Sequence, residues 1–195
     1  MEESKKETKR ILVHSCCAGC ASYVLEYLKE NFSPVAFFYN PNIHPQSEYL
    51  LRLNEMRALC NKLQVPLIEG PYNSDRWWDL IDPYKHLPER SERCRVCYQM
   101  RLQETAILAN EIKIDLFTTT LSVSPHKVYR WIEEIGRKLE AETGVKFHPE
   151  DFKKKDGFKK SVELSKQYGF TRQDYCGCYL SLSEAFEREK RKKKP

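Results

Sequence analysis

The chain has 195 residues, of which 41% are hydrophobic and 12% aromatic, so it is long enough to bury the core of a single domain. No apolar stretch is long enough to cross a bilayer, and the opening residues, MEESKKETKR, contain no apolar signal core, which predicts a cytoplasmic protein with no membrane partner. In that reducing compartment, the eight cysteines indicate metal ligands or redox groups rather than a disulfide framework.

The positive charge is concentrated at the end of the sequence. Residues 188–195, REKRKKKP, contain six basic residues and one acid, which accounts for the whole net charge of +5 and leaves the rest of the chain neutral. A basic tail favours contact with the phosphates of a nucleic acid, because each neutralised phosphate releases counterions. A solvated, frayed helix end explains the same charge run equally well.

Short apolar runs alternate with helical patterns along the sequence. Residues 1–9 are polar and predicted to be disordered, and strands are predicted near 10–15, 35–39, 65–68, 115–121 and 145–148. Helices are predicted near 19–31, from Pro45 to beyond Cys60, and at 94–110, 126–143, 157–169 and 183–195, the last as a basic helical tail. The aromatic stretch around Trp77 is assigned to neither class. This alternation predicts an α/β fold in which residues 10–182 form one three-layer sandwich with a mostly parallel sheet of four or five strands.

The first strand leads directly into a cluster of thiols. His14 and Ser15 end the apolar run, and the sequence Cys16-Cys17-Ala18-Gly19-Cys20 follows before the first helix. Ligands of open α/β sheets gather at the carboxyl ends of strands, and the N-terminus of a helix lowers the pKa of a nearby cysteine. The simpler alternative is that these are small buried residues that finish a strand.

Seven of the eight cysteines fall into three tight groups, because Cys60 belongs to the apolar stripe of a predicted helix. The groups are Cys16, Cys17 and Cys20; Cys94 and Cys97; and Cys176 and Cys178. Zinc is a common occupant of paired cysteines, but adjacent thiols and a Cys-Gly-Cys are unusual spacings for it. Many thiolates at irregular spacing favour an iron–sulfur cluster. The surplus thiols leave two arrangements open: a cluster beside a redox thiol pair, or a cluster beside a second metal.

Polar residues at predicted strand ends and helix starts surround these groups. They are His14, Asn40, His44, Tyr49, Arg52, Ser122, Lys127, Arg172 and Tyr175. Each has a structural explanation on its own, such as capping or flanking a helix. Together on one edge they predict a substrate pocket.

Several uncommon motifs occur in order between residues 10 and 182, and the sequence resembles the cobalamin-independent epoxyqueuosine reductases of the QueH type. The matching motifs are His14-Ser15-Cys16-Cys17-Ala18 with Cys20, Tyr39-Asn40-Pro41-Asn42-Ile43-His44-Pro45 with Glu48-Tyr49 and Arg52, Arg93-Cys94 with Cys97, Arg101-Leu102, Thr119-Thr120-Leu121 with Ser124-Pro125 and Lys127, Asp151-Phe152-Lys153-Lys154, and Arg172-Gln173 with Tyr175-Cys176-Gly177-Cys178 and Ser181. Gly19 departs from the family pattern, which has proline there, and the basic tail lies outside the resemblance.

The resemblance implies the last step of queuosine synthesis in tRNA: removal of the epoxide oxygen from the modified base at the wobble position. It also implies a nucleotide-hydrolase-like (HUP-like) fold, related to the pyrophosphatase-loop tRNA-modifying enzymes. The expected cofactor is an iron–sulfur cluster of the 4Fe-4S type with an additional mononuclear iron, and the expected partners are tRNA carrying epoxyqueuosine and an electron donor of unknown identity.

On this resemblance, six cysteines are expected to hold iron: Cys16, Cys17, Cys94, Cys97, Cys176 and Cys178. Cys20 is a weaker candidate, and the six are not divided among centres. Asp151 or Tyr175 is expected to supply a proton or a further metal ligand. The substrate-binding residues are expected to be His14, Asn40, His44, Tyr49, Arg52, Ser122, Lys127 and Arg172. Tyr49, Trp77, Trp78 or Tyr84 are the candidates for stacking on loop bases.

Two other functions are weighed against this one. A tRNA-thiolating enzyme of the pyrophosphatase-loop class needs a phosphate cradle with paired glycines and an acid, and the turn from Ser15 to Cys20 has neither. A zinc-stabilised RNA-binding module without catalysis would account for the paired cysteines, and would bind zinc with no iron.

Overall fold

The computed structural model describes residues 8–192 and places within them five strands, seven α-helices and two short 3-10 helices. The strands are β1 (Arg10–His14), β2 (Ser33–Phe38), β3 (Leu67–Glu69), β4 (Leu116–Thr119) and β5 (Lys146–Phe147). The helices are α1 (Ala18–Lys29), α2 (Gln46–Leu63), α3 (Ser74–Ile81), α4 (Glu92–Glu111), α5 (Tyr129–Thr143), α6 (Gly157–Gln167) and α7 (Tyr179–Lys192), with the 3-10 helices η1 (Asp82–Tyr84) and η2 (Thr120–Val123).

All five strands are parallel and lie in the order β3-β2-β1-β4-β5. His14, the last residue of β1, lies opposite Phe37 on β2 and Thr119 on β4. The strand order reverses between β1 and β4, and ligands of such sheets bind in the crevice outside the carboxyl ends of the strands at this switch point. The predicted α/β class is confirmed, and the sheet is wholly rather than mostly parallel.

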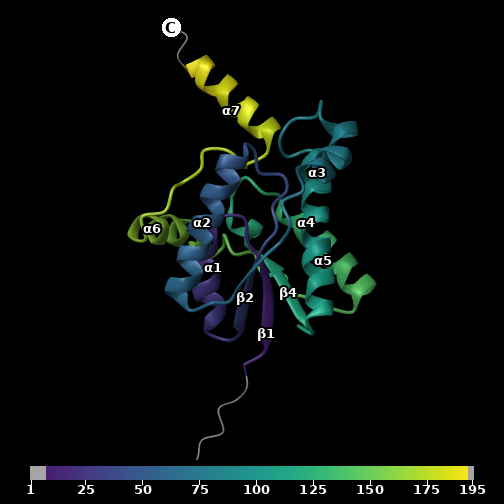
Figure 1. Ribbon diagram of the computed structural model, residues 1–195, viewed down its shortest axis with the longest axis vertical. Helices are drawn as coiled ribbons and strands as arrows, with labels where there is room; N and C mark the ends of the chain where they lie inside the picture. Colours follow the sequence, from purple (N-terminus) through teal and green to yellow (C-terminus); the bar gives the residue numbers. More distant parts are fainter. Residues whose placement is uncertain (1–7, 193–195) are drawn as a thin grey trace, which may run out of the picture.

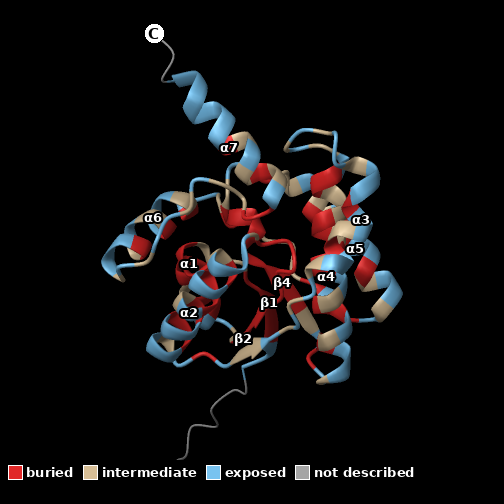
Figure 2. Cartoon of the chain, turned by 45° about the horizontal axis from the view of Figure 1, so that its top comes forward, coloured by how far each residue is buried: buried red, intermediate tan, exposed pale blue. Residues whose placement is uncertain are grey.

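Helices cover both faces of the sheet, as Figure 1 shows. Leu12 packs in a core formed with α3, α4 and α5, whereas its neighbours Ile11 and Val13 pack in a second core formed with α1, α2 and α6. This division follows from the geometry of a strand, in which successive side chains point to opposite faces. The buried sheet between two exposed helical layers is visible in Figure 2, and it confirms the three-layer arrangement.

Helix α3 was not predicted from the sequence. Its first turn is capped by Asn73, whose side chain accepts a hydrogen bond from the backbone N–H of Arg76 at 3.2 Å. Trp77 and Ile81, one turn apart, are both buried in the core under this helix. Eight residues with only two apolar anchors on the buried face give too short a periodic signal to be recognised.

The predicted terminal segments fall partly outside the described residues. The disorder expected for residues 1–9 concerns mainly residues 1–7, and residues 193–195 of the tail are likewise not described. The final helix begins at Tyr179, which is earlier than the predicted start at residue 183. Among the helices between residues 8 and 192, none combines the length and the apolar character needed to span a bilayer.

Gly136 allows α5 to lie close to the sheet, and we expect Gly136→Ala to destabilise the protein. A β-carbon at this position would lie 2.3 Å from the ring of Phe147 on β5, which is itself packed against Phe117. Overpacking costs about 1–3 kcal/mol, which outweighs the gain of at most about 1 kcal/mol from replacing glycine by alanine in a helix.

Urea denaturation measures this effect as a lower free energy of unfolding. Glu142→Ala, at an exposed position of the same helix, is the matched control and should change stability by less than about 0.5 kcal/mol. If the Gly136→Ala protein were as stable as the control, the ring of Phe147 would be able to move aside without lowering the free energy of unfolding.

Candidate active site

Buried hydrogen bonds tie together the carboxyl ends of β1, β2 and β4. The imidazole of His14 lies 2.9 Å from the Thr119 hydroxyl and 3.2 Å from the carbonyl oxygen of Tyr39, which follows β2. Asn40 donates its side-chain amide to the Ser15 carbonyl at 2.9 Å. All five residues are almost completely buried, so this network fixes the turn that follows Ser15 against the neighbouring strands.

His14 acts in this network as a neutral side chain. Burial and the positive charge of Arg101 lower the pKa of His14 to about 3. At neutral pH the ring therefore has one donor and one acceptor, so Nε2 donates to the Tyr39 carbonyl and Nδ1 accepts from Thr119. Both ring nitrogens of His14 are used within the fold, and His14 is not among the residues that line the cavity described below.

A cavity of about 490 Å³ lies beyond this edge of the sheet, within the range of roughly 300–1,000 Å³ typical of small-molecule sites. The turn after β1, η2, α2, the segment before α7 and α7 itself all contribute to its walls. The lining residues are Cys16, Cys17, Gly19, Cys20, Arg52, Glu89, Thr120, Leu121, Ser124, His126, Lys127, Phe158, Thr171, Arg172, Gln173, Asp174, Tyr175, Cys176 and Arg188.

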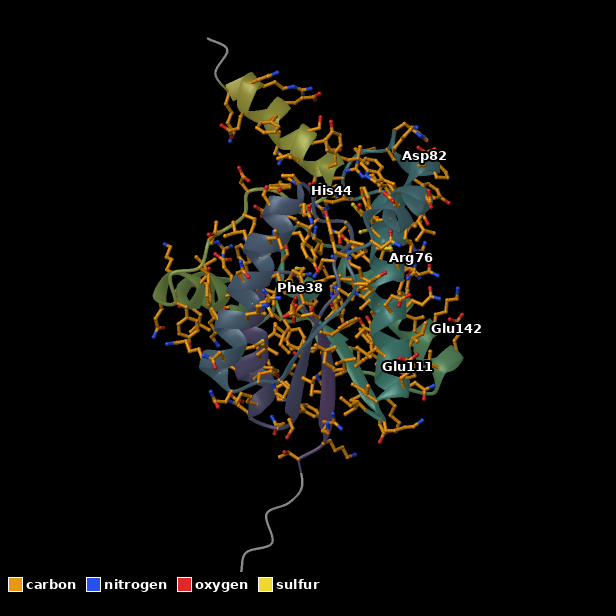
Figure 3. The ribbon with its side chains drawn as sticks, in the orientation of Figure 1. Phe38, His44, Arg76, Asp82, Glu111 and Glu142 are labelled. Carbon is orange, nitrogen blue, oxygen red and sulfur yellow. The ribbon has the colours of Figure 1, made fainter. Side chains whose placement is uncertain are left out.

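The Cys-Gly-Cys segment is held against the loop that follows β2. The backbone N–H of His44 donates to the Gly177 carbonyl at 2.7 Å, and the Tyr175 hydroxyl donates to the His44 carbonyl at 2.8 Å. In Figure 3, His44 lies at the end of the molecule where α7 begins. Gly177 has a φ of +114°, and a β-carbon there would lie 2.9 Å from the Arg52 guanidinium. Only glycine fits this close approach, so the backbone fold requires the residue between the two thiols to lack a side chain.

Cys94 and Cys97 lie on the first turns of α4 and belong to the same thiol group as the Cys-Gly-Cys segment. Burial is the main cause that raises the pKa of Cys94, and the nearby Cys176 and Cys97 raise it further. Burial and Cys176 likewise raise the pKa of Cys178 to about 12. Cys176 and Cys97 are therefore close enough to Cys94 and Cys178 to raise the pKa of both.

Cys16, Cys17 and Cys20 form a second thiol group on the turn after β1. The contact with Cys17 and burial raise the pKa of Cys16 well above its ordinary value. Cys16 lowers the pKa of Cys17, but the contact with Cys20 and burial outweigh it and raise that pKa to about 12. The prediction of a lowered pKa at the start of α1 was wrong for these two thiols, because burial and neighbouring sulfurs outweigh the helix dipole.

Three buried cations face these thiols. Lys127, only 8% exposed, donates from Nζ to the sulfur of Cys176 at 2.7 Å and lies 3.7 Å from Glu89. Burial opposes its charge, but Cys176 and its other neighbours raise the pKa of Lys127. Arg101 is 1% exposed and donates to the Cys97 carbonyl at 3.2 Å.

The guanidinium groups are only partly neutralised. Arg52, which is 2% exposed, pairs with Glu48 at 2.7 Å, whereas Arg101 forms no ion pair among residues 8–192. Each arginine also has one terminal nitrogen without a hydrogen-bond partner in the described part of the chain. A buried positive charge without a partner costs several kcal/mol, so binding of a negatively charged group beside these arginines would be favourable.

Four of the predicted substrate-binding or catalytic residues line the cavity: Arg52, Lys127, Arg172 and Tyr175. The guanidinium of Arg172 also lies over the Phe158 ring, 5.4 Å from its centroid. Burial and the nearby Glu48 raise the pKa of Tyr175 to about 12, so its hydroxyl keeps its proton at neutral pH.

The other predicted polar residues lie behind the cavity wall rather than on it. Asn40 and His44 fix backbone, as described above, and Tyr49 stacks on Tyr72 with ring centroids 4.0 Å apart. Ser122 donates to the Glu150 carbonyl at 2.9 Å and accepts from the Phe152 backbone N–H at 3.3 Å. None of these four residues is among those that line the cavity, and their contact with a substrate stays a prediction.

Asp151 also lies off the cavity wall. Its carboxylate is buried and lies 3.3 Å from the Lys153 ammonium.

The predicted base-stacking residues differ in exposure. Trp77 is only 1% exposed and so cannot stack on a base, whereas Trp78 and Tyr84 are partly exposed. Cys60 lies in the core with α1 and α2, and its prediction as a structural residue is confirmed.

Several residues in or beside the cavity were not predicted as site residues, although Thr120, Ser124, Gln173 and Arg101 belong to the motifs that carry the resemblance. They are Glu89, Thr120, Ser124, His126, Gln173, Asp174 and Arg188, with Arg101 buried nearby. Arg101 follows Cys97 by four residues, which places both on one face of α4. This spacing could have identified Arg101 from the sequence, because a basic residue on the same helix face as a cysteine can offset the negative charge of a thiolate.

All eight cysteines are free. Among residues 8–192, however, no group of three or more His, Cys, Asp or Glu side chains is arranged so that it could hold a metal ion. Cysteine ligands and buried cations suit a negatively charged metal–sulfur group. The sulfur positions in this structure do not form a closed metal site. A cysteine sulfur moves by rotation about a single χ1 torsion, so the two observations are compatible.

Comparisons with known proteins point to one family. The sequence model of epoxyqueuosine reductase QueH matches residues 11–184. The chain is 36% identical over 182 residues to the epoxyqueuosine reductase QueH of Streptococcus pyogenes serotype M1, covering 89% of this chain and 71% of the relative. It is 37% identical over 188 residues to that of Staphylococcus epidermidis, covering 92% and 79%. With the protein of Thermotoga maritima it shares 36% identity over 181 residues, covering 91% and 93%. The chain therefore belongs to the epoxyqueuosine reductase QueH family.

Proposed function

We propose that this chain reduces epoxyqueuosine in tRNA to queuosine with electrons delivered through iron held by its cysteines. Family membership makes it an enzyme, an epoxyqueuosine reductase of the final step of tRNA queuosine biosynthesis. The observation that carries the proposed chemistry is the gathering of two thiol groups and three buried cations around one cavity.

The residues proposed to hold iron are Cys16, Cys17, Cys94, Cys97, Cys176 and Cys178. A 4Fe-4S cluster with an adjacent mononuclear iron would supply single electrons to a reaction that consumes two electrons and two protons and releases the epoxide oxygen as water. The positive charges of Arg101, Arg52 and Lys127 would offset the negative charge of thiolate-bound iron. This assignment accounts for cations that no carboxylate fully neutralises.

The cavity residues would bind the modified base. Thr120 is completely buried, lines the cavity and has a hydroxyl without a partner in the described part of the chain, so it is available to a substrate. Tyr175 is the favoured proton donor because it lines the cavity; its hydroxyl would exchange its present acceptor, the His44 carbonyl, for the substrate. Asp151, which does not line the cavity and pairs with Lys153, is the second proposed proton donor or metal ligand.

The tRNA must present its wobble base unstacked, since an enzyme acting on a base takes it out of the stack.

The strand order agrees with a nucleotide-hydrolase-like (HUP-like) relationship to pyrophosphatase-loop tRNA-modifying enzymes. The electron donor is proposed to be a reductase or ferredoxin. The free thiols are in keeping with a cytoplasmic location.

Iron content tests the cysteine assignment. We expect anaerobically purified protein to be brown and to contain stoichiometric iron and acid-labile sulfide, and Cys94→Ala and Cys176→Ala to lose most of both, because each removes a proposed ligand. Cys60→Ala is the matched control and should keep them, since Cys60 lies in the core away from the cavity. Zinc without iron in the wild-type protein would instead establish the zinc-stabilised module.

Arg101→Gln tests the compensation of charge. Removing a buried positive charge disfavours the more negative, reduced state, so the midpoint potential of the bound iron should become more negative by tens of millivolts, about 59 mV for each tenfold change in a one-electron equilibrium. A potentiometric titration followed by visible absorbance measures this shift. Arg137→Gln, on α5 with a side chain 54% exposed and outside the cavity lining, should leave the potential unchanged. Equal potentials in both variants would contradict the role of Arg101.

Activity is tested by incubating the protein anaerobically with tRNA that contains epoxyqueuosine and a chemical reductant. Mass spectrometry of the nucleosides should show the loss of one oxygen atom. Tyr175→Phe should lower the rate about 10²-fold or more if its hydroxyl supplies the proton. Tyr27→Phe, on α1 and not among the residues that line the cavity, is the control and should react normally. Full activity in Tyr175→Phe would remove that residue from the mechanism, and failure of the wild-type protein would overturn the proposed function.

A further inference from the structure

The second half of α7 stands clear of the rest of the molecule. Every described residue from 186 to 192 is exposed, and the helix projects beyond the body in Figures 1 and 2. Phe186 is 61% exposed and Tyr179, at the start of the helix, is 54% exposed. Large aromatic side chains that are left in solvent mark a surface that another molecule can cover.

The charge of this helix is only partly neutralised by its own acids. Arg191 lies 3.9 Å from Glu187, and Lys192 lies 2.9 Å from Glu189. Arg188 and Lys190 have no acidic partner among residues 8–192. Residues 188–195 of the sequence together carry a net charge of +5 and the other residues sum to neutral, so the positive charge of the chain is concentrated at this end.

The helix also starts at the cavity. Tyr179 directly follows the Cys-Gly-Cys segment, and Arg188 lines the cavity wall. The match to the family ends at residue 184, so Arg188 and the residues after it extend beyond the matched region. A cation at the cavity wall thus continues into a basic arm.

We propose that α7 is an arm that binds the tRNA phosphate backbone next to the nucleotide whose base enters the cavity; this inference rests on the proposed function. Fourteen residues at about 1.5 Å each give a helix about 21 Å long, which exceeds the spacing between neighbouring phosphates of a nucleic-acid strand. The arm can therefore follow several consecutive phosphates. Phe186 offers a face on which an unpaired loop base can stack.

RNA fits this surface better than a second copy of the chain. Two copies paired through α7 would bring two positive arms together, and like charges repel. A polyanion neutralises them and releases counterions, which makes its affinity strongly dependent on salt. The exposed aromatic ring then adds contact with a base rather than with another protein.

The test measures binding of epoxyqueuosine-containing tRNA by fluorescence anisotropy over a series of salt concentrations, with the metal-loaded full chain. The arm variant combines Arg188→Gln, Lys190→Gln and Arg191→Gln, which removes charge while keeping good helix formers. The control variant combines Lys113→Gln, Lys138→Gln and Lys146→Gln, three exposed lysines away from the cavity, two of them beside the amino ends of β4 and β5. Both variants lose the same charge, so a difference between them reports position rather than net charge.

We expect the arm variant to bind at least tenfold more weakly at low salt, and its plot of log affinity against log salt to be shallower by about 0.7–0.9 for each lost phosphate contact. Phe186→Ala should weaken binding without changing that slope. Equal affinity and slope in the arm and control variants would overturn the inference, as would a monomer–dimer equilibrium that responds to the arm variant while tRNA binding does not.

The two proposals fail separately. Conversion of epoxyqueuosine tRNA by the wild-type protein, with an arm variant that binds normally, would refute the arm and leave the proposed function standing. A wild-type protein that binds tRNA through the arm without removing the epoxide oxygen would refute the function alone.

Discussion

The structure of the site depends on keeping positive charge buried beside sulfur. Arg101 and Lys127 lie almost wholly out of solvent, with Cys97 and Cys176 as their close partners. In water a guanidinium is stabilised by solvent, and here that stabilisation must come from the protein or from what the protein binds. Neutral, protonated thiols provide little of it. Thiolates bound to metal would provide much more, which gives the cations and the cysteines a common purpose.

The fold brings these groups together from distant parts of the sequence. The first thiol turn is fixed by the neutral His14 network at the switch point between β1 and β4. The Cys-Gly-Cys segment belongs to no strand and is instead held by the backbone of His44 and by the fit of Gly177 against Arg52. The cavity is therefore organised by backbone contacts as much as by the side chains that line it.

Much of the fold was predictable because its signals are local. The buried strands appear as short apolar runs, and the three cysteine groups are visible as spacings in the sequence. The roles of the polar residues after the strands were less predictable, since residues within one turn of the same helix have different neighbours in the fold. Ser122 and Tyr49 face the scaffold, whereas Thr120 and Arg52 reach the cavity, and only the tertiary structure distinguishes them. Arg101 was missed as a site residue because burial of a charge depends on the elements packed around it.

The attachment of Gly177 to His44 has a consequence for how the protein matures. The first thiols lie at residue 16 and the last at residue 178, and His44 can hold the final segment only after nearly the whole chain has been made. At about 5–20 residues per second, the ribosome needs on the order of 10–30 s between these points. During that interval the early cysteines wait without their partners. Loading of the proposed metal into the complete site would therefore follow the synthesis of residue 178.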